Sequence, residues 1–533
     1  MNSYFPSILN DAIGPVMRGA SSSHVAAAYR IGQLARDYMD GEFSSVLIEY
    51  DPNGSLEPTH ESQGSDMGLF TGLMGWDITD DRMVEAGAHL EQQGIAVEIR
   101  ITDYQASHAN TYRLTLSNKK TGESCCLLAI SIGGGIIEVI ALNGVHLSLF
   151  GDYHETLFLC PAEELESAPD FKTRLEQNPV VDFVLVHPAG ENYLVQVKGQ
   201  AFISTDDLRA AAGKDIKVLN RKVLAPVLPL CSQRQLSLPF RDSEEMIAYN
   251  KDKDLPLWKL ALIFESARGN VSEDTVFEKM RTIVQILEKS IAQGIAGTRY
   301  EDRMYPAQAP AFKEKVGSNA FLDLGLYNDA VLAVTALMDV KSSMGVIVAA
   351  PTAGSCGTLP GTCLGIATAL NMGEDQKVRA MLAAGLIGVF IAGKATFSAE
   401  LGGCQAETGS GSGMAAAALV TLLDGSFEQS LAAASMALQN TFGLICDPVA
   451  NRVEAPCLGK NVMMAGNALS AANMALAGFD PLIPLDEVIV AMHKVGQSIH
   501  SDLRCTGKGG LATTPTAKAL EHQLASKACG SCC

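Results

Sequence analysis

The chain has 533 residues, enough for two to four domains at about 150 residues each. Apolar residues make up 47% of the chain and charged residues 19%, which is the composition of a globular protein. The 59 acidic residues outnumber the 40 basic ones, and the formal net charge is -19. Because this charge repels phosphate backbones and anionic lipid, we expect no nucleic acid and no membrane as a partner.

The first residues and the cysteines point to the cytoplasm. The opening MNSYFPSILNDAIGP has no basic region followed by an apolar core, so we expect no secretory signal. The longest uncharged apolar run, residues 380–393, is shorter than the roughly 20 residues that cross a bilayer, which predicts a buried helix. In a reducing compartment the 13 cysteines should be buried thiols or metal ligands rather than disulfides.

Residues 1–150 are expected to form an α+β domain. Alternating, β-branched segments at 97–104, 110–118 and 125–144 predict strands, and segments of helical character lie between them. A second pattern follows over 151–205, in the order strand, helix, strand, turn, strand. This order suits a small ferredoxin-like regulatory module, and ordinary α+β packing explains it equally well.

The amino-acid composition changes after residue 205. Residues 206–245 are basic and contain proline, which predicts a linker. Residues 246–533 are rich in Ala, Leu, Met and Gly with helical periodicity, so this half should be mainly α-helical. The predicted fold class is therefore multidomain, with N-terminal α+β structure followed by a mainly α-helical domain.

Three cysteines stand at glycine- or proline-bounded positions in the second half. Cys404 lies in GGCQAE, Cys446 precedes Asp-Pro, and Cys457 follows Pro456, so all three are expected in loops that can converge. Soft thiolates on such loops suit an iron-sulfur cluster. Core packing is the alternative for three scattered cysteines, and zinc is another, although a close CxxC pair occurs only in the tail.

Several longer motifs resemble one enzyme family. The segments MGVIVAAPTAGSCGTLPG, GGCQAETGSGSGMAAA, CDPVANRVEAPCLGKN and GKGGLATTPTAKAL look like the catalytic part of the iron-sulfur-dependent L-serine dehydratases, or L-serine ammonia-lyases. The segments IGPVMRGASSSHVAAAYRIG, NGSLEPTHESQGSD, HANTYRLTL and SIGGGIIEVI resemble the β domain of that family. Both parts occur in order, so the two subunits that some members keep separate are expected to be fused here.

The resemblance implies a cofactor and a reaction. Residues matching Cys404, Cys446 and Cys457 hold a [4Fe-4S] cluster in the family, and one iron is left open as a Lewis acid. The implied reaction removes water and then ammonia from L-serine and yields pyruvate, a step of amino-acid degradation. The substrate partner would be a small amino acid. A homodimer is the family's tendency.

The resemblance also implies residues that bind the substrate. The turn formed by Thr352, Ala353, Gly354 and Ser355 would hold the carboxylate, and Ser131, Gly133 and Gly134 would offer a similar anion nest. Ser22, Ser23 and His24, with His108 and Asn110, would frame the site. Each of these also has an ordinary structural explanation as a helix cap, a turn or a hydrogen-bonded core histidine.

The general base is the point at which this chain departs from the family. Many relatives carry a histidine in a GHGTD-like motif, and the matching residue here is Gln63, which cannot exchange protons at neutral pH. His60 lies three residues upstream and is the expected substitute, in a polar group with Ser65 and Asp66. Either the base is reassigned, or the substrate differs from serine.

The chain ends in KACGSCC, which raises the question of a fourth ligand. Cys533 is a candidate for the open iron, with Cys532 and Cys529 as rivals, and an exposed tail is the alternative. Two further alternatives stay open for the whole protein. One keeps the cluster but removes another β-substituent, such as hydrosulfide from cysteine. The other is a non-catalytic amino-acid sensor whose cysteines bind zinc or pack in the core.

Overall fold

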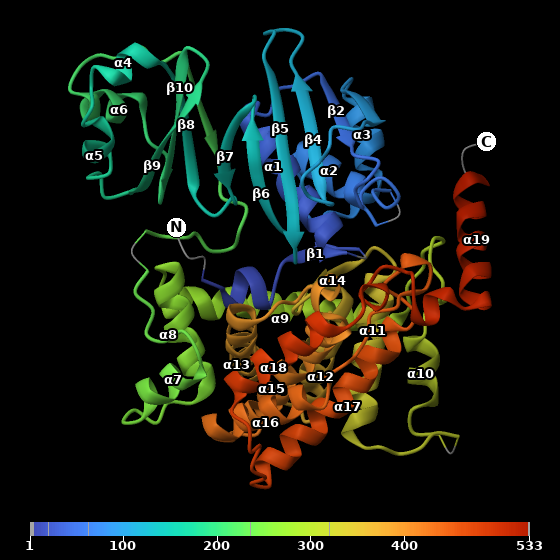
Figure 1. Ribbon diagram of the computed structural model, residues 1–533. Coiled ribbons are helices and arrows are strands. Elements are labelled where there is room, and N and C mark those ends of the chain that lie inside the picture. The colour runs from blue at the N-terminus through green and yellow to red at the C-terminus, as the bar shows by residue number, and fades with distance from the viewer. Residues whose placement is uncertain (1–4, 20, 62, 235, 319, 531–533) are drawn as a thin grey trace. The chain divides into compact units, whose positions relative to one another are not determined.

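The computed structural model describes residues 5–19, 21–61, 63–234, 236–318 and 320–530. The chain divides into two compact units: residues 23–236 form the first, and residues 3–22 with 237–533 form the second. The first unit is built on two sheets and the second mainly on helices (Figure 1). The predicted fold class, α+β structure followed by a mainly helical region, is confirmed.

The first sheet of unit 1 has six strands in the order β3-β2-β4-β5-β6-β7. Its only parallel pair is β2 with β3, and the other pairs are antiparallel. The helices α1 and α2 pack against this sheet through a shared apolar core. The elements are η2 (Ser22–Ala26), α1 (Ala27–Tyr38), β2 (Ser45–Tyr50), α2 (Ser65–Met74), η3 (Asp81–Glu85), α3 (Ala86–Gln92), β3 (Ala96–Ile101), β4 (Thr111–Ser117), β5 (Ser124–Gly133), β6 (Ile136–Leu142) and β7 (Val145–Leu149).

The second sheet of unit 1 has four antiparallel strands in the order β11-β8-β10-β9. Together with its helices it has the ferredoxin-like succession of strand, helix, strand, strand, helix and strand, around a core of its own. The elements are β8 (His154–Pro161), α4 (Ala162–Glu166), α5 (Phe171–Leu175), β9 (Val181–Ala189), β10 (Asn192–Gly199), α6 (Thr205–Ala212) and β11 (Asn220–Leu224).

The segment expected as a linker, 206–245, is therefore structured in part. Helix α6 begins inside a capping box in which Ser204 and Asp207 bond each other's backbone, and β11 pairs with β8. The linker expectation is wrong for these two elements, because a short basic strand paired at a sheet edge has too little alternation to be recognised in the sequence. The ferredoxin-like fold thus runs to residue 224 rather than 205.

Unit 2 is a helical bundle with one short two-stranded sheet, in which β1 pairs antiparallel with β12. Its helices are α7 (Ser243–Asn250), α8 (Leu257–Gly269), α9 (Glu273–Ala296), α10 (Ala309–Lys315), α11 (Leu326–Lys341), α12 (Thr358–Ala369), α13 (Glu374–Lys394), α14 (Ala399–Gly402), α15 (Ser410–Leu422), α16 (Phe427–Gln439), α17 (Cys457–Leu476), α18 (Leu485–Ser498) and α19 (Pro515–Gly530). Its other elements are η1 (Ile8–Ala12), β1 (Val16–Arg18), β12 (Val346–Val348), η4 (Ala353–Ser355), η5 (Gln405–Gly409), η6 (Val449–Asn451), η7 (Ser501–Leu503) and η8 (Gly510–Thr513).

The first residues of the chain belong to this helical unit and not to the α+β domain expected over 1–150. The buried Glu265 carboxylate of α8 accepts hydrogen bonds from the Ser7 hydroxyl at 2.5 Å and from the N–H groups of Ile8 at 2.9 Å and Leu9 at 3.0 Å. The helical turn η1 then packs on α13. A hydrogen-bonding partner 258 residues away leaves no mark in the local sequence.

Helix α13 is the one helix of the described residues that is long and apolar enough to cross a bilayer. Its apolar residues, from Val378 to Ile391, are buried inside the unit. This is the environment of a core helix, as the uncharged run at 380–393 predicts.

Candidate active site

Cys404 lies where the chain makes a sharp turn between α14 and η5. Gly403 has φ +71°, and a Cβ atom on it would lie 2.6 Å from the Leu444 carbonyl oxygen. Glycine is therefore required for this loop to approach the segment that leads to Cys446. The Cys404 thiol is buried, and its Sγ lies 3.1 Å from the Thr408 hydroxyl.

Cys446 is paired through its backbone with a third segment of the chain. Its N–H donates to the Leu503 carbonyl at 2.8 Å, and its carbonyl accepts from the Cys505 N–H at 2.8 Å. The Cys505 side chain packs against a small buried cluster that contains Cys404 and Cys446. Three cysteines from three loops thus meet in one place.

Cys457 is the first residue of α17 and is also buried. Burial raises the pKa of its thiol, and the nearby Cys404, Glu407 and Cys505 raise it further against the opposing charge of Lys341. Cys457 therefore lies within electrostatic range of the Cys404 and Cys505 thiols. The structure brings the three expected ligands together, with Cys505 as an unexpected fourth member of the group.

The environment keeps these thiols protonated in the absence of a metal. Burial, with the charge of Glu407, raises the pKa of Cys404 to about 11, although Lys460 acts in the opposite direction. The Cys505 thiol and burial raise the pKa of Cys446 well above its ordinary value. A metal that binds here must replace these protons, so its affinity will rise with pH.

Two lysines supply positive charge at this site. The Lys460 ammonium donates to the Ile445 carbonyl and to Asp447 Oδ1, each at 2.7 Å. Lys341 is fully buried, and its ammonium donates to the Val453 carbonyl. These charges favour the thiolate form of the cysteines once their protons are displaced.

The turn expected to bind a carboxylate lies against the cysteine loops. Thr352 caps η4, and its hydroxyl donates to Glu407 Oε1 at 2.7 Å. Asn461 on α17 donates to the carbonyl oxygens of Gly354 and Cys457, both at 2.9 Å. The buried Asn461 amide therefore connects the turn with the start of the helix that carries Cys457.

Glu407 is the last residue of the GGCQAE motif and a member of this site that the motif does not predict. Burial, together with the charge of Glu400, raises the pKa of this carboxyl to about 7, and the Thr352 hydrogen bond opposes the shift. Cys505 was also passed over, because a single cysteine before GKGG carries no spacing signal of its own.

Cys404 and Cys446, with Cys505 beside them, supply the soft sulfur donors that an iron-sulfur cluster needs. In the described part of the chain, no three His, Cys, Asp or Glu side chains are spaced to hold one ion. A tetrahedral zinc site needs sulfurs about 3.8 Å apart, given Zn–S bonds of about 2.3 Å, whereas a four-iron cube holds its ligands farther apart. The Ser410 hydroxyl, just after η5, is buried without a hydrogen-bond partner among the described residues.

The suggested fourth ligand Cys533, and its rival Cys532, lie outside the described residues, and the Cys529 side chain is likewise not described. Those expectations stay predictions.

In unit 1, the expected base is part of a hydrogen-bonded pair. His60 Nδ1 lies 2.5 Å from Asp66 Oδ2, and the Tyr50 hydroxyl donates to Asp66 Oδ1 at 2.8 Å. The His60 ring stacks on Tyr50 with 4.7 Å between centroids. Burial lowers the pKa of His60, but the Asp66 hydrogen bond and charge outweigh it, so the pKa is raised. Ser65 instead bonds the Tyr112 hydroxyl at 3.0 Å.

The remaining framing residues of unit 1 form a second polar chain. His24 Nε2 lies 3.1 Å from the Thr59 hydroxyl, and burial lowers the pKa of His24 to about 4. The Asn110 side chain accepts a hydrogen bond from the Ser55 hydroxyl. The backbone N–H of Asn110 donates to His108 Nδ1 at 3.1 Å. The half-buried imidazole of His108 thus accepts a local backbone hydrogen bond in the loop before β4.

The glycine run has a clear structural role. Ser131 donates from its hydroxyl to the Ser23 carbonyl at 2.8 Å, while Gly133 and Gly134 form the turn between β5 and β6 with φ +106° and +61°. The buried Arg30 donates to the carbonyl of the third glycine, Gly135, at 2.5 Å. Ser22 begins the short helical segment η2.

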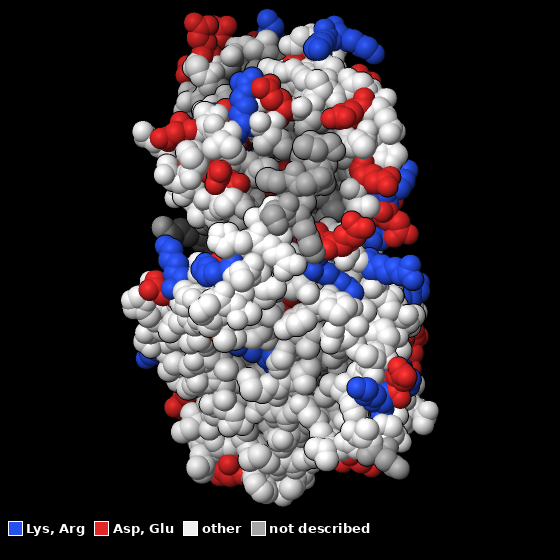
Figure 2. Space-filling view, turned by 90° about the vertical axis from the view of Figure 1, so that its right-hand side faces the viewer, with Lys and Arg blue, Asp and Glu red and all other residues white. Residues whose placement is uncertain are grey.

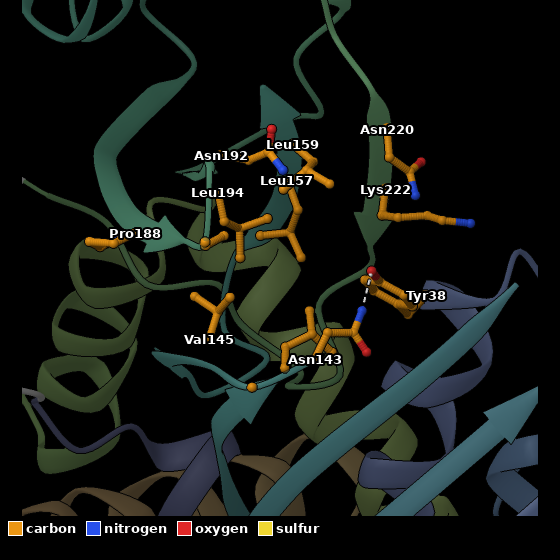
Figure 3. A pocket seen from close by; sticks show the side chains of 14 residues that line it. Tyr38, Asn143, Val145, Leu157, Leu159, Pro188, Asn192, Leu194, Asn220 and Lys222 are labelled. Atoms are coloured by element: carbon orange, nitrogen blue, oxygen red, sulfur yellow. Dashed lines mark hydrogen bonds between the residues drawn. The ribbon is translucent and has the colours of Figure 1, made fainter. Parts of the chain in front are cut away.

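A cavity of about 320 Å³ lies elsewhere in unit 1, between β-structure of its two sheets (Figure 3). Leucines 142, 157, 159 and 194 give it an apolar wall, and Tyr38, Asn143 and Lys222 are among its polar groups. The Asn143 amide donates to the Tyr38 hydroxyl at 2.9 Å. This volume is at the small end of the range for ligand sites.

The fold and the site together describe a chain with an α/β unit and a helical unit that carries a buried cysteine site. Comparison with known proteins assigns the helical unit. The family model described as "Serine dehydratase alpha chain" matches residues 242–512, which include the turn at 352–355 and all four converging cysteines.

Named relatives agree with this match. The chain is 40% identical over 292 residues to "Probable L-serine dehydratase, alpha chain" of Bacillus subtilis, covering 55% of this chain and 97% of that protein. It is 35% identical over 283 residues to the "L-serine dehydratase, alpha chain" of Peptoniphilus asaccharolyticus, covering 53% and 97%. It is 31% identical over 281 residues to "L-serine dehydratase 1" of Escherichia coli, covering 51% and 62%. The chain belongs to the serine dehydratase alpha-chain family.

Proposed function

We propose that the protein is an L-serine ammonia-lyase that depends on a [4Fe-4S] cluster and converts L-serine into pyruvate and ammonia. The observation that carries the proposal is that Cys404 and Cys446 lie in one buried cluster and that Cys457 lies within electrostatic range of Cys404, all in the part of the chain that matches the family. The names of the relatives support serine as the substrate.

The three cysteines would hold the cluster from three separate segments, with Cys404 at the start of η5, Cys446 in a loop and Cys457 at the start of α17. When bound, the cluster would supply a Lewis-acidic iron that stabilises the hydroxide as the C–O bond of serine breaks. Lys460 and Lys341 would offset the negative charge of the thiolates. The raised thiol pKa values mean that loading releases protons and proceeds better at mildly alkaline pH.

The turn at 352–355 would bind the substrate carboxylate through its backbone. The hydroxyls of Thr352 and Ser355 are used within the protein, by Glu407 and by the Ala350 carbonyl. Within the described residues, no hydrogen bond uses the N–H groups of Ala353 and Gly354. These two N–H groups begin a helical turn, where an anion is favoured.

His60 would take the α-proton of the substrate. Asp66 holds Nδ1 of the imidazole, so a neutral ring presents Nε2 as the proton acceptor, and the Asp66 charge stabilises the imidazolium that forms. Loss of the α-proton and of hydroxide gives the enamine of pyruvate. This enamine tautomerises to an imine, which water converts to pyruvate and ammonia.

The decisive experiment is anaerobic reconstitution of the full chain with iron and sulfide, followed by assay of pyruvate from L-serine. We expect about four irons per chain, a brown colour and activity that air destroys. Cys404→Ser, Cys446→Ser and Cys457→Ser should each lose the cluster and the activity, while Cys126→Ser, at an exposed thiol of unit 1, should keep both. Full iron content and turnover in all three site variants would refute the proposal.

The same preparation separates the alternatives. Faster release of hydrosulfide from cysteine than of ammonia from serine would make another β-substituted amino acid the substrate. A colourless protein that contains zinc and releases neither product would indicate a non-catalytic amino-acid sensor.

We also propose that the protein acts in the cytoplasm, where its thiols stay reduced, and that it forms a homodimer. Charged side chains are sparse over the helical unit on the face shown in Figure 2. Large apolar side chains of this unit are exposed, with Leu322 and Leu482 at 81% and Phe479 at 56%. Light scattering should give twice the 56.4 kDa chain mass, and a single chain mass would reject the dimer.

The ferredoxin-like module is proposed to be regulatory, with the cavity beside it as the place for a small effector. Addition of L-serine to the full-length protein should raise the unfolding temperature measured by calorimetry. Asn143→Leu, which alters the cavity, should make this increase smaller. An identical shift in both proteins would count against this role.

A further inference from the structure

Strand β3 (Ala96–Ile101) is an open edge of the six-stranded sheet of unit 1. It stands first in the strand order, and β2 is its only partner among the described strands. Five of its six residues are exposed, and Val97 is half-buried. A strand edge of this kind presents unpaired N–H and C=O groups to which another strand can bind.

The hydrogen bonds at both ends of β3 show which backbone groups point away from β2. The N–H of Ala96 donates to the Ser44 carbonyl at 3.0 Å, and the N–H of Thr102 donates to the Tyr50 carbonyl at 2.9 Å. Because backbone groups alternate in direction along a strand, those of the even-numbered residues face β2 and those of the odd-numbered residues face outward. A strand added at this edge must therefore bond residues 97, 99 and 101.

The charged residues of β3 restrict which strand can be added. Glu98 and Arg100 lie on one face of the sheet, where Arg100 Nε donates to Glu98 Oε1 at 2.5 Å and both side chains are more than half exposed. Arg100 stands in register with Glu49 of β2, which forms an ion pair with Arg113 of β4. The charges thus alternate in sign across three strands. A negative charge beyond Arg100 would continue this alternation.

A second copy of β3 supplies that charge when it runs antiparallel to the first. With Ile99 opposite Ile99 of the second copy, each Glu98 lies opposite an Arg100, and the two-fold symmetry makes this contact twice. The neighbouring registers that keep the outward groups paired place Glu98 opposite Glu98 or Arg100 opposite Arg100. The strand is therefore complementary to itself in the register centred on Ile99.

The other face of β3 is apolar and incompletely covered. Val97 packs on the core of the sheet, whereas Ile99 is 37% exposed and Ile101 is 47% exposed. In the register centred on Ile99, the two Ile99 side chains meet each other and each Val97 meets an Ile101. Removal of this apolar surface from water favours the same pairing as the charges do.

We propose that β3 is the contact through which two copies of this chain associate, as an antiparallel pair with Ile99 on the two-fold axis, so that the two sheets become continuous. The inference rests on the homodimer of the proposed function and locates its interface. It is independent of the cluster and of the reaction. The exposed apolar side chains of unit 2 are the rival interface.

The test measures the mass of the full-length protein by sedimentation over a range of concentrations. Glu98→Arg and Arg100→Glu each place like charges opposite each other, and the double variant restores opposite charges in exchanged positions. Ile99→Pro removes an outward N–H and leaves the hydrogen bonds to β2 in place. Glu191→Arg, at an exposed residue of the turn between β9 and β10, is the matched control for a reversed charge.

We expect a dimer for the wild type and a dissociation constant at least about tenfold higher for either single reversal. The double variant and Glu191→Arg should stay within about threefold of the wild type. Ile99→Pro should sediment as a single chain with the circular dichroism spectrum of the wild type. Hydrogen exchange of the peptide 96–101 should slow as the concentration of the wild type rises, but not as that of Ile99→Pro rises.

A dimeric wild type that is matched in affinity by both single reversals and by Ile99→Pro overturns the inference alone and moves the interface to the apolar surface of unit 2. Single reversals that weaken the dimer with no rescue in the double variant also overturn it. A wild type that sediments as a single chain at every concentration overturns the homodimer and this inference together.

Discussion

The polar group around His60 in unit 1 and the cysteine site in unit 2 differ in how their hydrogen bonds are made. In unit 1, the His60 and Asp66 pair is completed by Tyr50, and the neighbouring polar side chains bond one another. In unit 2, the thiols have raised pKa values and the buried Ser410 hydroxyl has no partner among the described residues. The first set of groups is paired within the protein, and the second contains the thiols that we propose as ligands. Variants that act on one arrangement and not on the other test this difference.

The largest expected effect comes from His60→Ala, which should lower the rate of pyruvate formation by about 10²- to 10⁴-fold, the usual contribution of a general base. The cluster content should be unchanged, because His60 is not among the thiols. Asp66→Asn should give a smaller loss and shift the acid limb of the pH profile, since the Asp66 charge raises the pKa of His60. Pyruvate formation at the wild-type rate in His60→Ala would exclude His60 as the base.

Glu265→Ala should destabilise unit 2 by about 3–5 kcal/mol, because it leaves the donors of Ser7, Ile8 and Leu9 buried without an acceptor. Urea unfolding monitored by the fluorescence of Trp258 in a Trp76→Phe background measures the change. Glu278→Ala, at a surface ion pair on α9, should cost less than about 1 kcal/mol. Equal costs for the two variants would show that the N-terminal segment adds nothing to unit 2.

Acid should weaken unit 1 through His24. Its pKa falls from 6.5 in the unfolded chain to about 4 in the folded one, so between these pH values the unfolded state binds more protons. The contribution is complete above pH 6.5 and is lost as the pH falls to 4, about 3 kcal/mol in all. Unfolding followed by Trp76 in a Trp258→Phe background should show a flatter pH dependence in His24→Gln.

His60 acts with the opposite sign in that experiment. Its pKa is raised in the folded protein, so its contribution is present at low pH and is lost as the pH rises through the folded value. His146→Gln, at an exposed histidine of unit 1, is the control and should leave the pH dependence as it is. A His24→Gln profile that follows this control would refute the assignment to His24.

The smallest effect is expected at the glycine turn. Gly134 has φ +61°, and a Cβ atom there would meet nothing within 4 Å, so Gly134→Ala should cost about 1 kcal/mol of unit 1 stability through its backbone alone. The KM for serine should stay within about twofold of the wild type if the glycines only form a turn. A tenfold increase in KM would instead support the anion nest expected from the sequence.

Much of the fold could be predicted because its signals are local. Alternation marked β4, β5 and β6, and helical periodicity marked α13, α15 and α16, since burial of one face repeats every few residues. The glycine and proline positions around the three predicted cysteines likewise indicated breaks between helices: Cys446 lies in a loop, whereas Cys404 and Cys457 stand where η5 and α17 begin.

The missed features are those made by distant segments. Cys505 joins the other thiols through a backbone pairing with Cys446, and the Thr352 hydroxyl reaches Glu407 across 55 residues of sequence. Such contacts depend on tertiary packing and leave no periodic pattern. The placement of residues 3–22 in unit 2 was missed for the same reason.

The pairing of β1 with β12 also sets an order of events during synthesis. Residues 16–18 leave the ribosome first, but their partners at 346–348 emerge only after all of unit 1 has been translated. Strand β1 therefore stays unpaired while unit 1 is synthesised and folds. A gene cut between the two units would leave the second protein without its opening strand, and the excised residues would have to be supplied separately to restore it.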